Sequence, residues 1–321
     1  MKKLVPSCLV ILISLFVIYQ TTDAQYQTLS PSSNYSSERA PGRVLYVSPQ
    51  GYLDTIRFRP IYKTMSEAFS VVRRGDTIKL YGKLREGGLT TPLNVTDVTI
   101  IGMGTKVRSG RTEAPVNNLM SGSADWTNSV NNKTNPILTI ISAGWSIENI
   151  HFSNTTTNIS TIRLDRNGSN RAANYTQIIN SYFYGGLRGI EDNGGNAQVG
   201  VYNNTFYNSI TGIESTSTSQ ALPLMWEIIG NRFVQNRNHI KMPLSNSIIR
   251  DNVLFRYGYE SLNIVSIDLS AGGKNNSIFN NSLAHLFNQR GYVNTAYSSG
   301  TNDSWGPNYY SDKEGYGVPR E

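Results

Sequence analysis

A six-residue pattern of apolar and polar positions returns six times between Trp145 and Leu283. Each copy opens on an aliphatic residue, has a small polar residue or glycine two positions later, and closes on a large apolar residue five positions after the first. The copies begin at Ile147, Ile178, Val201, Ile228, Ile249 and Ile278, at intervals of 31, 23, 27, 21 and 29 residues. A repeat of this length without helical periodicity indicates a solenoid, in which each coil packs on the next.

A second apolar position follows this pattern at a fixed distance. In three coils an isoleucine stands seven residues after the closing aromatic residue: Ile190, Ile213 and Ile240. Each coil is therefore predicted to carry at least two short strands joined by a turn. The small polar position suits the bend between strands, because Asn tolerates the left-handed backbone region. Asn side chains at one level per coil are also expected to hydrogen-bond along the stack.

These repeats resemble the right-handed parallel β-helix of the pectate-lyase-like superfamily, over roughly residues 60–290. In that superfamily a capping helix followed by a Gly-Asp-Thr-Ile strand is a common entry. Here Thr64 and Glu67 have the spacing of a capping box, and Gly75-Asp76-Thr77-Ile78 follows. The resemblance implies an all-β solenoid with a short N-terminal capping α-helix. It implies no single activity, because this fold hosts lyases, hydrolases, esterases, adhesins and phage tailspikes.

Composition divides the rest of the chain. Residues 1–24 have the features of a secretory signal peptide, with a basic start at Met1-Lys2-Lys3, an apolar run and a small residue at Ala24. Residues 25–43 form a flexible leader, residues 44–293 the capped β-helix, and residues 294–321 a C-terminal cap or tail. Residues 105–136 lack a strand pattern and are predicted to be a long loop within the β-helix. We therefore expect a secreted, extracellular protein without a membrane span after cleavage.

The charge balance points to an anionic partner. The chain of 321 residues carries 29 Lys and Arg against 22 Asp and Glu, a net charge of +7. An acidic polysaccharide or a cell-surface glycan fits this charge. Nucleic acid is disfavoured, because the basic residues are scattered and form no recognised motif. The sequence leaves open whether the protein is a monomer or a homotrimer.

Metal and thiol chemistry find little support in the sequence. Cys8 is the sole cysteine and lies in the signal segment, so disulfides and thiolate metal sites are not expected. The three histidines show no metal-ligand spacing, so we expect no metal site and no cofactor. No motif supports a calcium site, but the sequence does not exclude one.

A column of charged residues is predicted next to the isoleucine row. Ile162 and Ile267 extend the row of Ile190, Ile213 and Ile240, and the residue after each isoleucine faces outward because side chains alternate along a strand. That column reads Arg163, Glu191, Glu214, Lys241 and Asp268. The preceding residues read Thr161, Gly189, Gly212, His239 and Ser266.

This column has the residue types of a carbohydrate-cleaving site. Glu191 and Glu214 on adjacent coils fit the ~5 Å carboxyl separation of a retaining glycosidase, and Glu214 with Asp268 approaches the wider spacing of an inverting one. Like charges on adjacent coils are expected to raise the pKa of one carboxyl, as a general acid needs. A lyase would instead use Lys241, Arg163 or His239 as its base. These three residues and Asp165, which lies on the same face, are also candidates for substrate binding. Trp126, in the predicted loop, is a further candidate for gripping an acidic sugar chain.

Alternating signs along the column favour a second interpretation, an ion-pair ladder at a solvated surface. The register of Asp268 is also open, because Val265 fits the same position. No calcium site or arginine motif of pectate lyases and no catalytic set of polygalacturonases is present. Two functions therefore remain. The first is a secreted β-helix that binds and cleaves an acidic polysaccharide as a lyase or glycoside hydrolase. The second is a non-enzymatic extracellular protein, either an adhesin or structural protein or a tailspike-like glycan binder.

Overall fold

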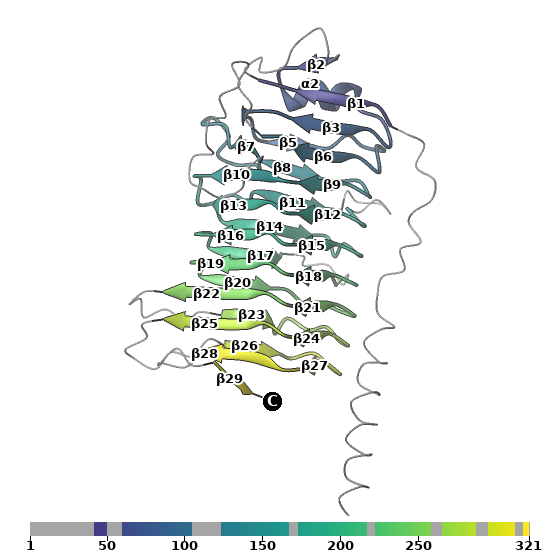
Figure 1. Cartoon of the computed structure of the whole chain (residues 1–321). Coiled ribbons are helices and arrows are strands. Elements are labelled where there is room, and N and C mark those ends of the chain that lie inside the picture. The colour runs from purple at the N-terminus through teal and green to yellow at the C-terminus, as the bar shows by residue number, and fades with distance from the viewer. Residues whose placement is uncertain are drawn as a thin grey trace, which may run out of the picture. The chain divides into compact units, whose positions relative to one another are not determined.

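Three sheets of parallel strands carry the repeats, and successive turns of the chain add strands to each sheet in the same order (Figure 1). A computed structural model describes residues 42–49, 60–104, 123–166, 173–216, 222–257, 265–286, 295–311 and 317–320. These residues belong to one unit, Pro41–Glu321. The predicted signal peptide, and all of the predicted leader before residue 42, lie outside the described residues. Parallel sheets wound in this way from one chain make a parallel β-helix, as the sequence predicts.

Each sheet takes its strands from successive turns of the chain. Sheet A contains β1 (Val44–Val47), β2 (Ile61–Tyr62), β3 (Thr77–Leu80), β6 (Thr99–Gly102), β9 (Ser146–Glu148), β12 (Gln177–Ile179), β15 (Gly200–Tyr202), β18 (Glu227–Ile229), β21 (Ile248–Arg250), β24 (Ser277–Phe279) and β27 (Ser304–Trp305). Sheet B contains β4 (Lys83–Arg85), β7 (Ala124–Thr127), β10 (Ile150–Asn154), β13 (Tyr182–Gly185), β16 (Thr205–Tyr207), β19 (Arg232–Val234), β22 (Val253–Tyr257), β25 (Ser282–Leu286), β28 (Asn308–Ser311) and β29 (Gly317–Arg320). Sheet C contains β5 (Leu89–Thr90), β8 (Leu138–Ile140), β11 (Ile162–Asp165), β14 (Arg188–Asn193), β17 (Thr211–Ser215), β20 (Asn238–Lys241), β23 (Val265–Leu269) and β26 (Thr295–Ser298).

The six-residue pattern forms the corner between sheets A and B. Its aliphatic residue lies in the strand of sheet A and its closing apolar residue in the strand of sheet B. The small polar position turns the chain with a positive φ, from 48° to 70°, at Asn149, Asn180, Asn203, Gly230, Asp251 and Asn280. The predicted left-handed bend is therefore confirmed. Each coil has a third strand, in sheet C, which carries the isoleucine row.

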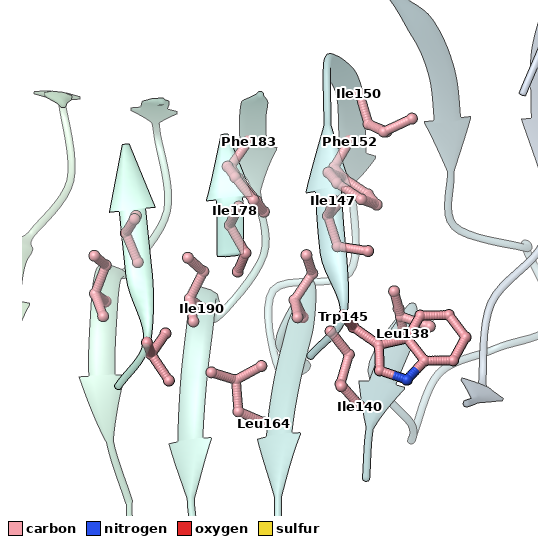
Figure 2. Packing of buried hydrophobic residues seen from close by; sticks show 14 of the residues in the cluster. Leu138, Ile140, Trp145, Ile147, Ile150, Phe152, Leu164, Ile178, Phe183 and Ile190 are labelled. Atoms are coloured by element: carbon pink, nitrogen blue, oxygen red, sulfur yellow. The ribbon is translucent and has the colours of Figure 1, made fainter. Parts of the chain in front are cut away.

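The core lies inside the three sheets and is built from rows of identical positions. Phe152, Phe183, Phe206 and Phe233 stack with ring centroids 4.8 to 5.2 Å apart. Figure 2 shows Phe152 and Phe183 beside Ile147 and Ile178 of the same coils, with Ile190 from sheet C among the buried side chains. Because every coil repeats these positions, each coil buries its apolar side chains against those of the next.

A ladder of buried asparagines runs beside the corner between sheets A and B. The first four members each follow a left-handed residue, and Asn308 continues the row in the last coil: Asn204, Asn231, Asn252, Asn281 and Asn308. The side-chain oxygen of each accepts a hydrogen bond from a backbone N–H of the preceding coil, at 2.8 to 3.1 Å. Hydrogen bonding along the stack was thus correctly expected, but this ladder uses the residue one position after the predicted column.

The predicted capping helix is confirmed as α2 (Met65–Val71). Thr64 and Glu67 form the capping box, and Glu86 accepts hydrogen bonds from the backbone N–H groups of Met65 and Ser66, at 2.8 and 3.1 Å. The helix buries Phe69, whose ring meets Trp145 edge-on at 5.7 Å. Within the described residues, no helix has the length and apolarity needed to cross a membrane.

Two segments differ from the prediction. The strand β7 occupies part of the predicted 105–136 loop, because Ala124 and Trp126 face the core and β7 pairs with β4 and β10. Beyond residue 293, β26, β27 and β28 continue the three sheets, so the β-helix extends further than the predicted boundary. Its last strand, β29, pairs antiparallel with β28. Residues 105–122, which hold the remaining charged positions of the predicted loop, lie outside the described residues.

Candidate functional site

The charged column on sheet C has the predicted register. Five strands align one isoleucine each: Ile162, Ile190, Ile213, Ile240 and Ile267. The next residues therefore align as well, in the order Arg163, Glu191, Glu214, Lys241 and Asp268. The alternative that places Val265 in this column is wrong, because Val265 pairs with Asn238, and Asp268 pairs with Lys241.

Glu191 is the most buried carboxylate of this column. Its Oε2 accepts hydrogen bonds from Ser160 Oγ at 2.7 Å and from Arg163 Nε at 3.0 Å, and its Oε1 accepts one from Thr216 Oγ1 at 2.8 Å. Burial raises the pKa of Glu191, but these hydrogen bonds outweigh burial, so the pKa lies below its ordinary value. The expected rise in pKa is therefore wrong for this carboxyl, which does not suit a general acid.

The other two carboxylates of the column are also held by neighbours. Glu214 lies between two cations, with its Oε2 2.5 Å from Arg188 Nε and its Oε1 3.3 Å from Lys241 Nζ. The Oδ1 of Asp268 accepts a hydrogen bond from the backbone N–H of Ser270 at 2.9 Å. Arg163, Arg188 and Lys241 thus form ion pairs with Glu191 and Glu214, as the ladder interpretation predicts.

Two other predicted site residues, Asp165 and Trp126, lie outside the charged column. Asp165 is partly exposed on β11, where its Oδ1 accepts hydrogen bonds from Arg166 N at 2.8 Å and from Asn193 Nδ2 at 3.3 Å. The prediction for Trp126 is wrong: its ring is fully buried 5.4 Å from Phe152, and its Nε1 donates to the carbonyl of Glu86.

The prediction for His239 as a substrate-binding residue is also wrong. Its side chain is 1% exposed, and its ring lies 6.0 Å from that of Phe233. Glycines occupy the same row in the two preceding coils, and a Cβ at Gly212 would lie 2.7 Å from the ring of Phe233. The row before the isoleucines therefore faces the core, so His239 has no access to a ligand outside the β-helix.

A groove lies on the outer face of sheet B, away from the charged column. It has a volume of ≈ 730 Å³. One row of its lining comes from residues that immediately precede the buried row of sheet B: Lys83, Asp125, His151, Tyr182, Thr205 and Arg232. A second row immediately follows the buried row: Thr127, Ser153, Tyr184, Tyr207 and Val234. The groove runs from β4 to β19, and four of its strands, β10, β13, β16 and β19, lie one above another in Figure 1.

Aromatic side chains form the middle of the groove. Tyr184 and Tyr207 stack at 5.9 Å between ring centroids, and Tyr184 is 37% exposed. Tyr182 is largely buried beside them, and burial, together with the neighbouring Tyr207 and Tyr184, raises the pKa of its phenol to about 12. Tyr182 therefore keeps its proton at neutral pH. Tyr184 and Tyr207 together form an aromatic patch on the wall of the groove.

Charged side chains lie at both ends of this aromatic surface. Lys83 and Arg232 are five strand spacings apart, or ~24 Å along the stack. Between Lys83 and the tyrosines, His151 Nδ1 lies 3.0 Å from Asp125 Oδ1. The ring of His151 in turn meets that of Tyr182 edge-on at 4.9 Å. Two cations, one carboxylate and one imidazole therefore line the groove together with the tyrosines.

The sequence contained the signal for this groove. Each closing apolar residue of the six-residue pattern points inward, so the residues on either side of it point outward. Around Phe152 and Phe183 those neighbours are His151, Ser153, Tyr182 and Tyr184. Sequence reasoning followed only the row beside the isoleucines and missed this one.

Metal binding gains no support from either face. Among the residues that the structure describes, no group of three or more His, Cys, Asp or Glu side chains is arranged to hold a metal ion. In the groove, Asp125 is the one carboxylate that lines the described surface. Of these two described surfaces, only sheet C brings two carboxylates into register, as the glycosidase hypothesis requires.

Comparison with known proteins gives similarities of fold. No family model matches the chain, and no curated protein matches it either. Among solved structures, the surface adhesin PfbA of Streptococcus pneumoniae is 12% identical, with a TM-score of 0.37 over 77% of this chain and 83% of the adhesin. A PL6 alginate lyase in complex with a trisaccharide is 12% identical, with a TM-score of 0.41 over 88% of this chain and 62% of the lyase. The Dettilon tailspike protein is 12% identical, with a TM-score of 0.34 over 84% of this chain and 70% of the tailspike. At such identities the similarity concerns the fold alone, and the sheets described above identify that fold as a parallel β-helix.

Proposed function

We propose that the protein is an extracellular binder of anionic polysaccharide and that the chain of sugars lies in the groove of sheet B. One observation carries this proposal: an exposed tyrosine stack lies between Lys83 and Arg232 in a continuous groove. Aromatic rings offer apolar faces on which sugar rings stack, and guanidinium and ammonium groups bind carboxylate or sulfate. The predicted signal peptide of residues 1–24 supports an extracellular site of action.

The two charged faces differ in how their cations are used. On sheet C, Arg163 and Lys241 are already paired with glutamates of the same column. In the groove, Arg232 is exposed and has no ion pair with another described residue. Within the described part of the chain, an incoming anion therefore displaces no carboxylate at Arg232, which favours the groove as the binding site.

Loss of Arg232 tests the proposal. A hydrogen bond to a charged group contributes about 1.5–3 kcal/mol, and because the groove is open to solvent we take the lower end. Arg232→Ala should then weaken binding about 10-fold. Binding to polygalacturonate, alginate and chondroitin sulfate is measured by calorimetry at low ionic strength, where screening is weak. Arg250→Ala is the matched control, because Arg250 lies on sheet A and pairs with Asp251.

The outcomes separate the two faces. Unchanged affinity of Arg232→Ala, together with loss of binding in Lys241→Ala, would move the site to sheet C. Failure of the wild-type chain to bind any of the three polysaccharides would overturn the proposal. Weaker binding by Tyr184→Ala and Tyr207→Ala, with Arg250→Ala unaffected, is the expected result.

A second candidate function is cleavage of the polysaccharide on sheet C. It is supported by carboxylates in register on that sheet, namely Glu191, Glu214 and Asp268, with Arg163, Asp165 and Lys241 as substrate-binding residues. The pairing of these groups with one another weighs against it. Glu214→Gln tests it, because that substitution should abolish a turnover if Glu214 is catalytic and leave turnover unchanged if the column is an ion-pair ladder.

A further inference from the structure

We propose that the groove of sheet B is also catalytic, with His151 as the general base that cleaves a bound uronate chain by β-elimination, Tyr182 as the proton donor and Asp125 as the residue that positions His151. This inference rests on the proposed binding of anionic polysaccharide in the same groove. It places the chemistry on a different sheet and on different residues from the charged column.

Asp125 fixes the proton on one nitrogen of His151. The Nδ1 atom lies 3.0 Å from Asp125 Oδ1, and an ionised carboxylate only accepts hydrogen bonds. The proton of the neutral imidazole therefore sits on Nδ1, and the lone pair is left on Nε2. No described residue hydrogen-bonds to Nε2. A base oriented by a carboxylate behind it is the arrangement found in proton-abstracting active sites.

His151 lies within the groove in which we place the sugar chain. His151 lies between Asp125 and Tyr182 in one row of the groove, since β10 pairs with β7 on one side and β13 on the other. The carboxylate lies on the β7 side, so Nε2, on the opposite side of the ring, is directed away from β7. The side chain keeps 18% of its surface exposed, and it lines the groove. His151 and the tyrosines therefore line the same groove, in which we place the bound sugar.

Tyr182 supplies the acid partner. Its ring contacts that of His151 at 4.9 Å, and burial raises the pKa of its phenol to about 12, so the hydroxyl remains protonated over the working range of a histidine base. A protonated phenol is able to hydrogen-bond to a departing sugar oxygen and to donate its proton as that bond breaks.

The chemistry balances without another reactant. His151 Nε2 removes the proton from C5, next to the carboxylate of a uronate unit. The electron pair of that C–H bond forms the C4–C5 double bond, the C4–O4 bond breaks, and O4 leaves with the proton of Tyr182. Transfer of the proton from His151 back to Tyr182 restores both residues. The net change is an unsaturated uronate end and a new reducing end, with no water or oxidant consumed.

Hydrolysis fits the groove less well. Glycosidases use two carboxyl groups, and Asp125 is the one carboxylate that lines the described groove. That carboxylate is engaged by His151. Elimination needs one base and one proton donor, which are the groups present.

The experiment uses the full chain and five variants: His151→Asn, Asp125→Asn, Tyr182→Phe, Glu214→Gln on sheet C and, as a control on sheet A, Arg250→Ala. Polygalacturonate, alginate and chondroitin sulfate are supplied as substrates, and unsaturated ends, reducing ends and binding are measured in parallel. His151→Asn should lower the formation of unsaturated ends by about 10²- to 10⁴-fold, the usual contribution of a general base, with binding retained. Tyr182→Phe should lower kcat with little change in KM, and Arg250→Ala should match the wild type.

Asp125→Asn gives a readout that a merely structural residue would not. Asparagine offers its amide N–H or its carbonyl to Nδ1, so the tautomer with the lone pair on Nε2 loses its preference. We expect a lower kcat at unchanged KM and a displaced acid limb of the pH–rate profile, because that limb reports protonation of the base.

Each alternative result is decisive. Binding without cleavage by the wild type overturns the catalytic inference and leaves the proposed binding function intact, whereas absence of binding overturns both. Reducing ends without unsaturated ends would identify hydrolysis and reject the elimination. Cleavage that survives in His151→Asn but is lost in Glu214→Gln would place catalysis on sheet C.

Discussion

Replacing Glu191 by glutamine should destabilise the protein rather than remove an activity. Glutamine has nearly the shape of glutamate but keeps one acceptor oxygen in place of two. Glu191 uses both of its oxygens, one with Ser160 and Arg163 and the other with Thr216. Whichever way the amide turns, an N–H₂ group faces donors that previously met a carboxylate.

The size of the effect follows from the burial of these groups. Breaking a fully buried charge pair costs about 3–5 kcal/mol. The carboxylate of Glu191 is 5% exposed, but the side chains of Arg163 and Arg188 are 33% and 19% exposed. Water therefore solvates the two guanidinium groups in part after the carboxylate is removed, which reduces the cost. We therefore expect Glu191→Gln to lower the free energy of unfolding by about 2–3 kcal/mol at pH 7. Lys241→Gln, at a half-exposed position of the same column, should change it by about 0–1 kcal/mol.

Acid provides an internal check on the cause. Because the pKa of Glu191 is lowered in the folded state, its charge stabilises the protein above the ordinary glutamate pKa near 4.5, and that contribution is lost as the pH falls through the lowered value. The stability difference between wild type and Glu191→Gln should be full at pH 7 and should shrink below pH 4.5. Urea unfolding followed by circular dichroism at several pH values measures it. Equal stability of the two proteins at pH 7, with a polysaccharide-cleaving activity lost in the variant, would refute the ladder interpretation and make Glu191 catalytic.

Two further substitutions test the packing of the coils. Asn231→Ala should lower the free energy of unfolding by about 2–4 kcal/mol, because the buried N–H of Asn204 loses its acceptor and other hydrogen bonds of the Asn231 side chain are lost with it. The same urea assay measures this difference. A cost no larger than that of the exposed control Asn131→Ala would contradict the prediction. Gly212→Ala should cost about 1–3 kcal/mol, because the added Cβ would lie 2.6 Å from the carbonyl of His239 and 2.7 Å from the Phe233 ring. An unchanged melting temperature for that variant would show that the close approach is relieved at no cost.

The fold and the register of sheet C were predictable because inward positions repeat once per coil. A row of isoleucines has to stay on the inside, and a slip by one residue would turn it to the outside. That constraint is strong enough to place Asp268 beside Lys241, as the structure confirms. The same rule, applied to the residues flanking Phe152, would have found His151 on the outer face.

Other features of the site depend on contacts that cannot be predicted from the spacing of the sequence repeats. The partners of Glu191 include Ser160 and Thr216, which lie outside its column and reach it because the chain bends at the ends of β11 and β17. The inward direction of His239 follows from the space that glycines leave for phenylalanine rings in earlier coils. Trp126 was assigned to a loop because the residues of β7 do not carry the six-residue pattern by which the other coils were recognised.

In-register stacking makes the length of the groove a modular property. Each coil from β10 to β19 contributes one residue to each lining row, and neighbouring coils are ~4.8 Å apart. Inserting or deleting one coil would therefore lengthen or shorten the groove by one such step, while the corners and the core of the remaining coils stay as they are, since each coil contacts only its neighbours. Duplication of the gene segment that encodes one coil would therefore change the length of sugar polymer that the proposed site spans, without changing the residues of the other coils.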